Sequence, residues 1–254
     1  KYAITCSSVR GNLPVNYSYS YGFMGRLIAY FHLKRLKKLN YVVSMTQSMA
    51  DQVENYTGCH SPVIGNFVDE RKILKYSKYK KKEDKLRFIF TGSFSERKHP
   101  LLLIKVMEKI YSQGINFTFD MFGDGPLLKS CKEMAKKIGI ENLIIFHGHV
   151  QEPYSFISSA DALILPSYSE GVPRSALEAL CLGIPCILRN VDGNRELIQS
   201  GINGELFNSS SELPDLILRV ARQKKYKNTQ KKNLLPEAFR QNSCARLYLN
   251  LISQ

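Results

Sequence analysis

The chain has 254 residues, of which 44% are hydrophobic and 11% aromatic, and this composition excludes a disordered or low-complexity protein. Its 36 Lys and Arg residues against 22 Asp and Glu residues give a net charge of +14, which favours an anionic partner such as nucleic acid, a phosphorylated small molecule or an acidic membrane. No apolar run approaches the roughly 18 residues that a membrane-spanning helix needs.

The first part of the chain alternates strand-like and helix-like patterns. We expect a strand at 2–5, a polar loop, a helix near 24–39, a strand at 41–45 and a helix near 47–56. The chain opens directly on the strand-like pattern without an initiator Met, so we expect residues to precede it. We interpret residues 1–68 as the remainder of an N-terminal α/β domain.

The stretch KILKYSKYKKKEDK has no hydrophobic periodicity, and we predict a basic, solvated linker over 69–85. After it, short apolar strands alternate with helices up to residue 232. The strands are expected at 86–92, 115–123, 143–148, 162–166, 185–189 and 204–207. Such strands indicate a doubly wound, Rossmann-like parallel sheet covered on both faces. Residues 233–254 carry apolar residues at helical spacing and predict a closing helix.

Two strand ends carry unusual residues, and the first is FTGSFSERKHP. Gly92 allows a close turn of the backbone, and Arg97 and Lys98 follow near the start of the next helix. A glycine loop and a cation suit a pyrophosphate, because open backbone amides and positive charge both attract it. A strand-end glycine with a solvated basic pair is the simpler alternative.

The second strand end is YSEGVPRSALEALCLGIP, which places Glu170 before a helix and Glu178 inside it. Pro173 suits the first helical turn, so the helix is expected to start at Pro173 or Arg174. The two carboxylates would lie roughly 10 Å apart. This is about the span from the ribose of a nucleoside diphosphate to an attached sugar, so Glu178 could accept ribose hydroxyls and Glu170 could hold sugar hydroxyls.

Spacing alone does not identify a site. Glu133 and Glu141 have the same separation, but Glu133 lies among lysines on what is predicted to be a solvated helix end. Glu170 instead follows a buried strand and precedes Gly-Val-Pro and an apolar helix. A helix-capping role for Glu170 is a further alternative.

These segments together resemble family 4 glycosyltransferases with the GT-B fold. EGVPRSALEALCLGIPCI is similar to the family's E-x7-E signature, FTGSFSERKHP to its phosphate loop, and FGDGPL, IIFHGHV and ADALILPSYSEG to further family segments in the same order. SMTQSMADQV and VIGNFVD resemble the segments that close the N-terminal domain. The likeness spans about residues 40–222, and five segments in one order are far more specific than any single motif.

The resemblance implies a two-domain enzyme that moves a sugar from a nucleoside-diphosphate sugar, a UDP-sugar being favoured, to a glycan or lipid-linked acceptor with retention of anomeric configuration. It implies bacterial surface polysaccharide synthesis in the cytoplasm, with no cofactor or metal. Residues 86–232 would bind the donor and residues 1–68 the acceptor. Lys98 and Glu170 would be catalytic. The implied donor-binding set is Gly92, Ser93, Arg97, Lys98, Gly148, Glu170, Gly171, Val172, Pro173, Leu177 and Glu178.

The sequence departs from the family pattern at two places. Ser93 stands where the family commonly has an arginine, so Arg97 would have to supply that charge. The family's histidine after an N-terminal strand is not evident in YAITCSSVRG, where Cys6, Ser7 and Ser8 stand. Because the fold would normally include about a hundred further residues, we expect this fragment to bind donor without transferring it.

The helix near 24–39 combines apolar residues with Lys34, Arg35, Lys37 and Lys38. It could rest on the anionic inner face of the plasma membrane, or it could simply cover a sheet with its apolar stripe. Six scattered cysteines without metal-ligand spacing indicate free thiols in a reducing compartment. They are Cys6, Cys59, Cys131, Cys181, Cys186 and Cys244.

Two other functions compete with glycosyl transfer. A sugar-nucleotide epimerase would need acid and base groups, and of the five histidines only His99, His147 and His149 lie near predicted strand ends. A noncatalytic anion-binding or nucleic-acid-binding module would explain the charge and would need aromatic platforms among the basic runs. Only a faint version of that pattern is present, in Tyr76, Tyr79 and Tyr226. We therefore expect no nucleic-acid partner.

Overall fold

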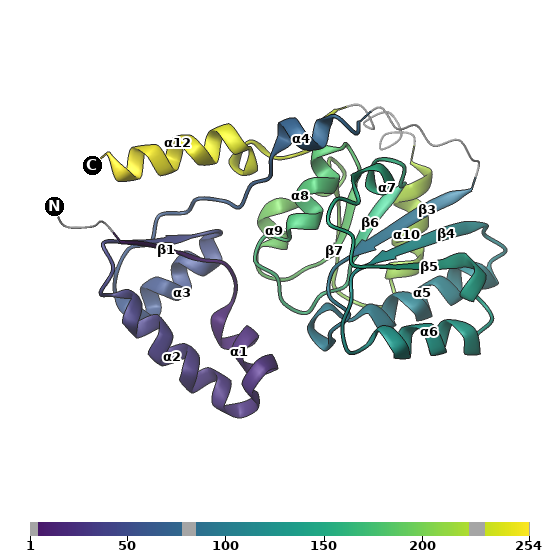
Figure 1. Ribbon diagram of the computed structural model, residues 1–254, viewed down its shortest axis with the longest axis horizontal. Coiled ribbons are helices and arrows are strands. Elements are labelled where there is room, and N and C mark those ends of the chain that lie inside the picture. The colour runs from purple at the N-terminus through teal and green to yellow at the C-terminus, as the bar shows by residue number, and fades with distance from the viewer. Residues whose placement is uncertain (1–4, 78–84, 224–231, 254) are drawn as a thin grey trace.

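A six-stranded parallel sheet forms the centre of the larger part of the molecule (Figure 1). The structure, a computed structural model, describes residues 5–77, 85–223 and 232–253. The spatial order is β5-β4-β3-β6-β7-β8. The strands are β3 (Leu86–Thr91), β4 (Phe117–Phe122), β5 (Ile144–Gly148), β6 (Ala162–Leu165), β7 (Cys186–Arg189) and β8 (Gly204–Phe207). This arrangement confirms the expected doubly wound sheet.

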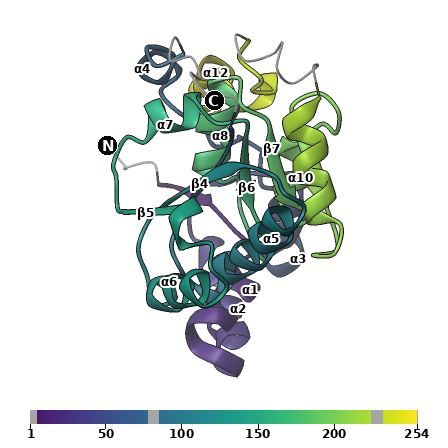
Figure 2. The same ribbon diagram turned by 90° about the vertical axis from the view of Figure 1, so that its right-hand side faces the viewer.

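Helices cover both faces of this sheet. In the view of Figure 2, α5, α6 and α10 lie on one side of the sheet, and α7 and α8 lie on the other. The helices are α5 (Pro100–Ser112), α6 (Leu128–Lys137), α7 (Tyr154–Ser158), α8 (Arg174–Cys181), α9 (Asn194–Leu197) and α10 (Leu213–Arg222). Because helices cover both faces, the central strands are the most buried: all four residues of β6 and the first three of β7 are buried and apolar.

The order in which strands are added to the sheet reverses between β3 and β6. From β3 the chain adds β4 and β5 on one side, and it then returns to place β6 against the other side of β3. The connections that leave the carboxyl ends of β3 and β6 therefore diverge, which leaves a crevice between them. Such a switch point is where open parallel sheets bind ligands.

The smaller part contains a two-stranded parallel sheet and three helices. Its elements are β1 (Cys6–Val9), α1 (Leu13–Tyr21), the 3-10 turn η1 (Gly22–Met24), α2 (Gly25–Leu36), β2 (Tyr41–Ser44) and α3 (Gln47–Thr57). α2 packs through one face, which consists of Gly25, Ala29, Leu33 and Leu36. Gly25 is required there because a Cβ atom would lie 2.2 Å from the backbone of Tyr17 in α1.

The first part of the chain differs from the expectations at two places, and a third expectation lies largely outside the described residues. The first described strand is Cys6–Val9, and of the strand expected at 2–5 residues 2–4 are not among the described residues. The expected polar loop contains α1, because Asn12 caps its N-terminus by accepting from the Val15 amide at 3.2 Å and Pro14 suits its first turn. The expected linker begins with a short helix, α4 (Glu70–Leu74), while 78–84 lie outside the described residues.

The end of the chain returns to the smaller part. After the 3-10 turn η4 (Glu237–Phe239), α12 (Gln241–Ile252) lies along the N-terminal part in Figure 1. Cys244 packs with Val43 and Ile64. Glu70 accepts from the Gln241 amide at 2.8 Å, so the carboxylate holds the start of α12 against α4. The closing segment therefore joins both parts of the molecule.

Candidate active site

The crevice between β3 and β6 receives the two segments that carry the predicted residues. β3 leads through Gly92 into the 3-10 turn η2 (Glu96–Lys98), and β6 leads through a loop at 166–173 into α8. Pro173 is the N-cap residue of α8 and Arg174 its first helical residue. Since β3 and β6 are hydrogen-bonded neighbours, η2 and this loop emerge side by side.

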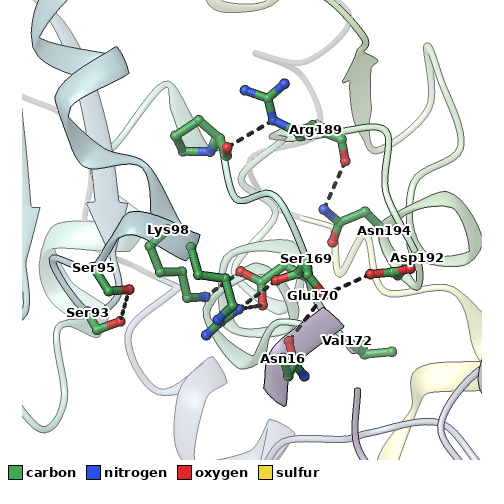
Figure 3. Close-up of polar contacts among 12 residues, drawn as sticks. Asn16, Ser93, Ser95, Lys98, Ser169, Glu170, Val172, Arg189, Asp192 and Asn194 are labelled. Atoms are coloured by element: carbon green, nitrogen blue, oxygen red, sulfur yellow. Dashed lines mark hydrogen bonds and ion pairs between the residues drawn. The ribbon is translucent and has the colours of Figure 1, made fainter. Parts of the chain in front are cut away.

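Lys98 and Glu170 form an ion pair in this crevice (Figure 3). The Lys98 side chain is 12% exposed and the Glu170 side chain 7%. The Arg97 guanidinium lies 3.6 Å from the other carboxylate oxygen of Glu170. Two cations therefore face one buried carboxylate, which leaves positive charge available for an incoming anion. The described contacts of the Glu170 side chain are with Lys98 and Arg97. None of them caps a helix, which was the alternative role considered for this residue.

Backbone contacts between η2 and the loop fix this arrangement. The Tyr168 amide donates to the Arg97 carbonyl at 2.8 Å, and the Arg97 guanidinium donates to the Ser169 carbonyl at 2.6 Å. His99, which takes φ 50°, stacks on the Tyr168 ring with centroids 4.6 Å apart. Burial lowers the pKa of His99, so the neutral ring is favoured in this stack.

Glycines stand at the ends of three adjacent strands, and we call Gly92, Gly123 and Gly148 the glycine floor. The Gly92 amide donates to the Phe122 carbonyl at 3.0 Å, and the Gly123 amide donates to the Gly148 carbonyl at 2.7 Å. Gly123 has φ +126°, and a Cβ atom there would lie 2.0 Å from the Gly92 carbonyl oxygen, so no other residue type fits. Of the three, Gly92 lines the crevice, where a Cβ atom would lie 3.6 Å from the Lys98 stem.

A cavity of about 470 Å³ opens above this floor. It is lined by Thr91, Gly92, Lys98, His149, Val150, Gln151, Pro153, Glu170, Pro173, Arg174, Ser175 and Glu178. Glu178 is 8% exposed and accepts from the Arg174 guanidinium at 3.1 Å. Burial raises the pKa of Glu178 despite the opposing effect of Arg174. The cavity is thus lined by two ion pairs, Lys98 with Glu170 and Arg174 with Glu178.

A second cavity, of about 600 Å³, lies between the two parts of the molecule. Its walls are Arg10, Asn16, Tyr19 and Ser20 from the smaller part and Ser95, Glu96, Arg97, Pro126, Glu170 and Gly171 from the larger part. Glu170 lines both cavities. Glu170 therefore lies at the boundary between the first cavity, which the larger part forms, and the second cavity, which both parts form.

Polar contacts hold the loop of Glu170 against the smaller part. Ser169 Oγ donates to Asn16 Oδ1 at 3.2 Å or to Asp192 Oδ2 at 3.0 Å (Figure 3). The Asn66 side chain donates to the Val172 carbonyl at 3.2 Å. Gly171 touches the other part directly, because a Cβ atom there would lie 2.3 Å from the Arg10 carbonyl oxygen. The position of the loop therefore depends on how the two parts meet.

A carboxylate from the larger part also caps a helix of the smaller part. Glu196, in α9, accepts from the Gln47 amide at 3.0 Å and from the Ser48 amide at 3.4 Å. These are the first two amides of α3, which have no partners within the helix. The contact combines hydrogen bonds with the favourable placement of a negative charge at a helix N-terminus.

The structure brings five predicted residues to the first cavity, namely Gly92, Lys98, Glu170, Pro173 and Glu178. The others lie elsewhere. Arg97 and Gly171 line the second cavity, and Gly148 forms part of the glycine floor. Ser93 is exposed and contacts Ser95 at 3.1 Å, outside both cavities.

Val172 and Leu177 belong to the expected donor-binding set, and both have buried side chains in the core. For Val172 the expected donor contact is through its backbone N–H, which burial of the side chain does not contradict. Helical spacing explains the position of Leu177, because it lies on the face of α8 that covers the sheet. Val172 contributes its carbonyl oxygen to the contact with Asn66 rather than a side chain to the cavity.

Sequence reasoning missed two groups of cavity residues. The segment after β5 supplies His149, Val150, Gln151 and Pro153, of which only His149 and Val150 lie in the family-like segment IIFHGHV. The smaller part supplies Arg10, which directly follows β1. No motif pointed to Gln151, Pro153 or Arg10.

The histidines and tyrosines named for the two rival functions do not gather at one site. His147 contacts buried Asp120 at 2.6 Å and stacks on Phe122, so it belongs to the packed sheet. Tyr76 packs on Tyr154 with ring centroids 5.4 Å apart. Tyr79 and Tyr226 lie outside the described residues. His149 alone of the three histidines lines the first cavity.

The described ranges contain neither a metal-binding cluster nor a membrane-spanning helix. Among those residues, no three His, Cys, Asp or Glu side chains come together in a way that could hold a metal ion. Over the same part of the chain, none of the helices has both the length and the apolar character needed to cross a bilayer. The six cysteines are free thiols, as expected.

Comparisons with known proteins agree with this architecture. A model of the family described as glycosyl transferases group 1 matches residues 72–234. A lipopolysaccharide 1,6-galactosyltransferase from Salmonella typhimurium is 37% identical over 92 residues, which cover 34% of this chain and 26% of that protein. The curated relatives described for this chain are matched over 26% to 52% of their own length.

Two solved structures share the fold at low identity. A mutant of S. aureus TarM in complex with fondaparinux, α-GlcNAc-glycerol and UDP has a TM-score of 0.82 and 18% identity, covering 100% of this chain and 52% of TarM. Anabaena HepE in complex with UDP and glucose has a TM-score of 0.79 and 18% identity, covering 98% of this chain and 71% of HepE. Because the family model covers well over half of the residues, the chain belongs to the glycosyl transferases of group 1.

Proposed function

We propose that this protein transfers a sugar from a nucleoside-diphosphate sugar, with UDP-sugar as the favoured donor, to a glycan or lipid-linked acceptor with retention of anomeric configuration. The observation that carries the proposal is the position of Glu170. Its carboxylate is buried, faces Lys98 and Arg97, and lines both the cavity of the larger part and the cavity between the parts. A reacting sugar between donor and acceptor would have to occupy that boundary.

The first cavity has the charges that a nucleoside diphosphate needs. Lys98 would meet the diphosphate at the glycine floor and stabilise the negative charge that develops on the leaving group. Glu178 would accept the ribose hydroxyls in its ionised form. The segment from His149 to Pro153 would border the base. The UDP in the TarM and HepE structures supports uridine as the nucleoside.

Binding of the donor would change the partners of Glu170. Without donor, the carboxylate pairs with Lys98. A diphosphate near Lys98 would take over that ammonium, which leaves Glu170 to hold donor-sugar hydroxyls and the positive charge that develops at the anomeric carbon. Arg97 would keep the carboxylate oriented through its contacts with Glu170 and the Ser169 carbonyl.

The second cavity would receive the acceptor. It offers hydroxyl, amide and guanidinium groups from Tyr19, Asn16 and Arg10 beside Glu170. The match to a lipopolysaccharide galactosyltransferase supports a role in bacterial surface polysaccharide synthesis, on the cytoplasmic side where nucleotide sugars are made. This step of the proposal concerns the whole protein, because the matched relatives extend beyond the matched stretch.

Metal-independent transfer is part of the proposal. The ammonium of Lys98 and the guanidinium of Arg97 would supply the positive charge that a bound cation supplies in other phosphate sites. Donor hydrolysis that is unchanged by a chelator is the expected result. Loss of hydrolysis on chelation, with recovery on addition of Mg²⁺ or Mn²⁺, would contradict this step.

Substitutions at the ion pair test the proposal. In Lys98→Ala, UDP affinity should fall and sugar-nucleotide hydrolysis should fall by about 10²- to 10³-fold. In Glu170→Gln, UDP affinity should change little while hydrolysis falls, because the carboxylate acts on the sugar. Thermal shift with UDP and a hydrolysis assay give the two readouts, since a bound ligand stabilises the folded state.

Glu133→Gln is the matched control. Glu133 has the same eight-residue relation to Glu141, but its side chain is 65% exposed and its partner Lys129 lies at 3.8 Å. This variant should keep full UDP binding and hydrolysis. If Lys98→Ala and Glu170→Gln also kept both, the assignment of the site would be refuted.

A further inference from the structure

An arginine at the end of β7 contacts the loop between β6 and α8. β6 and β7 pair in a register that sets Leu165 against Leu188. The residue after Leu188 is Arg189, and its Nε donates to the carbonyl oxygen of Pro166 at 3.0 Å. The pairing of these two strands therefore places a guanidinium at the start of that loop.

The Arg189 guanidinium also lies over two aromatic rings. Its central carbon is 4.8 Å from the centroid of the Tyr168 ring and 5.0 Å from that of Phe207. Each contact is a cation–π interaction, which strengthens where water is partly excluded. His99 stacks on Tyr168, and burial together with the charge of Arg189 lowers the pKa of His99, so the neutral imidazole is favoured. Arg189 therefore binds both the backbone and a side chain of the loop.

Packing alone does not account for a charged residue at this place. Arg189 Nη2 is buried and has no hydrogen-bond partner in the part of the chain that the structure describes. Over the same residues, no Asp or Glu forms an ion pair with Arg189. A buried cation without a carboxylate lowers the stability of the folded state, and an apolar side chain of similar length would fill the space without that cost. The charge and the planar shape of Arg189 therefore point to a task in the neighbouring site.

The turn that follows Arg189 also contacts the loop. Asn194 Nδ2 donates to the Arg189 carbonyl at 3.0 Å and fixes the turn after β7 (Figure 3). Asp192, within this turn, takes φ 32°, a left-handed conformation that residues other than glycine rarely adopt. From this position Asp192 Oδ2 accepts from Ser169 Oγ at 3.0 Å. The end of β7 and its turn thus hold the loop at Ser169 as well as at its start.

We propose that Arg189 is a positioning residue for sugar transfer, which sets the place of the Glu170 carboxylate through the loop. Tyr168 and Ser169 directly precede Glu170 in the chain. A change in their positions would therefore move the carboxylate relative to Lys98, with which it pairs. Arg189 lines neither the first nor the second cavity, so it acts without contact to donor or acceptor. This role rests on the proposed function, because it concerns the reaction that Glu170 would serve.

Arg189→Met keeps a long side chain and removes the guanidinium. The kcat of sugar-nucleotide hydrolysis should fall about tenfold to a hundredfold, because a small displacement of a catalytic group has effects of that size. UDP affinity should change by less than about twofold, since Lys98 and Glu178 are left in place. Arg195→Met is the matched control and should leave hydrolysis unchanged, because the exposed Arg195 side chain donates to Asn190 and to no residue of the loop in the described ranges. Full hydrolysis in Arg189→Met would overturn the proposal.

The combination with Glu170→Gln tests whether Arg189 acts through that carboxylate. In a chain that already carries Glu170→Gln, Arg189→Met should slow hydrolysis by less than about twofold further, because the effects of residues that act as one unit are not additive. The same fractional loss in this background as in the natural chain would show an independent role and would overturn the proposal. Full hydrolysis in Glu170→Gln alone would instead refute the proposed function, so the two failures are distinguishable.

Hydrogen exchange gives a readout that needs no reaction. The Tyr168 amide donates to the Arg97 carbonyl at 2.8 Å, and in Arg189→Met it should exchange about tenfold faster, because the loop loses its cation–π and hydrogen-bond contacts. The Leu163 amide, which donates to the Pro185 carbonyl at 3.0 Å inside the sheet, should keep its natural exchange rate. Unchanged exchange at Tyr168 would overturn the proposal. Equal acceleration at both amides would show a general loss of stability and would overturn it as well.

Discussion

The two parts of the molecule differ in how they bury their strands. In the larger part, all four residues of β6 are buried, and large side chains such as Phe88 and Phe119 are completely covered. In the smaller part, β1 buries only Val9 of its four residues. The larger part therefore builds its cavity from its own strand ends, whereas the smaller part completes a site only by contact with its neighbour.

That contact combines close backbone approach and polar groups with apolar packing, since Met49 and Val172 belong to one buried cluster. Gly171 lies against the Arg10 carbonyl, Glu196 caps α3, and Ser169 contacts Asn16. Such contacts are individually worth about 1 kcal/mol and are lost together when the parts separate. Donor binding and acceptor placement should consequently respond differently to substitutions at the junction.

The largest effect is expected for Gly171→Ala. A Cβ atom would lie 2.3 Å from the Arg10 carbonyl oxygen, so the smaller part must move at a cost of about 1–3 kcal/mol. Small-angle scattering should show a larger radius of gyration, and hydrolysis should fall more than UDP affinity. In Gly92→Ala the nearest atom is 3.4 Å away, so the overall dimensions should not change. A compact Gly171→Ala variant would contradict the role given to this contact.

A smaller effect is expected for Glu196→Gln. Replacing the charged cap weakens the contact with α3 by about 1 kcal/mol, and the amides of Gln47 and Ser48 should exchange hydrogen about fivefold faster. Glu212→Gln is the matched control, because Glu212 accepts from the Asn208 and Ser209 amides within the larger part. If the amides of Gln47 and Ser48 also exchanged hydrogen faster in the control, the effect would come from a general loss of stability and not from the loss of the Glu196 cap.

Glu178→Gln should have opposite effects on the two properties: the folded state becomes more stable, whereas UDP binds more weakly. Burial raises the pKa of Glu178 above its value in the unfolded chain. Such a group costs stability at a pH above its raised folded pKa, and this cost is relieved as the pH falls from that pKa to the ordinary value near 4.5. The variant should melt up to a few degrees higher than the natural protein at pH 7, with no gain at pH 4, and should bind UDP more weakly. A lower melting temperature at pH 7 would show that the contact with Arg174 outweighs burial.

The smallest effect concerns thiol reactivity. Cys6 and Cys59, both in the smaller part, are exposed, whereas the other four cysteines are buried. Burial raises the pKa of Cys131 and Cys181 to about 12 and that of Cys244 to about 11, and it also raises the pKa of Cys186. An alkylating reagent should therefore modify two thiols rapidly in the folded protein. Rapid modification of Cys186 would contradict the packing of β7.

The amino-acid sequence was sufficient for the larger part because its signals are local. Apolar runs of four to six residues and helical periodicity located all six strands and placed α8 to within one residue. In the smaller part the same patterns located α2, β2 and α3 but missed α1, because YSYSY has no helical periodicity and was expected to form a polar loop. Asn12 and Pro14 nevertheless start a helix there, because α1 packs against α2 through the close approach at Gly25.

For the candidate site, the sequence by itself determined which strand ends carry glycines, cations and carboxylates. It placed Lys98, Glu170 and Glu178 at strand ends or in the helix that follows, because parallel strands expose their carboxyl ends at one edge. Only the tertiary structure decided that Lys98 and Glu170 pair, that Arg97 faces the second cavity, and that Val172 and Leu177 are core residues. These outcomes depend on strand order and on the junction with Arg10, which are set by packing between segments far apart in the chain.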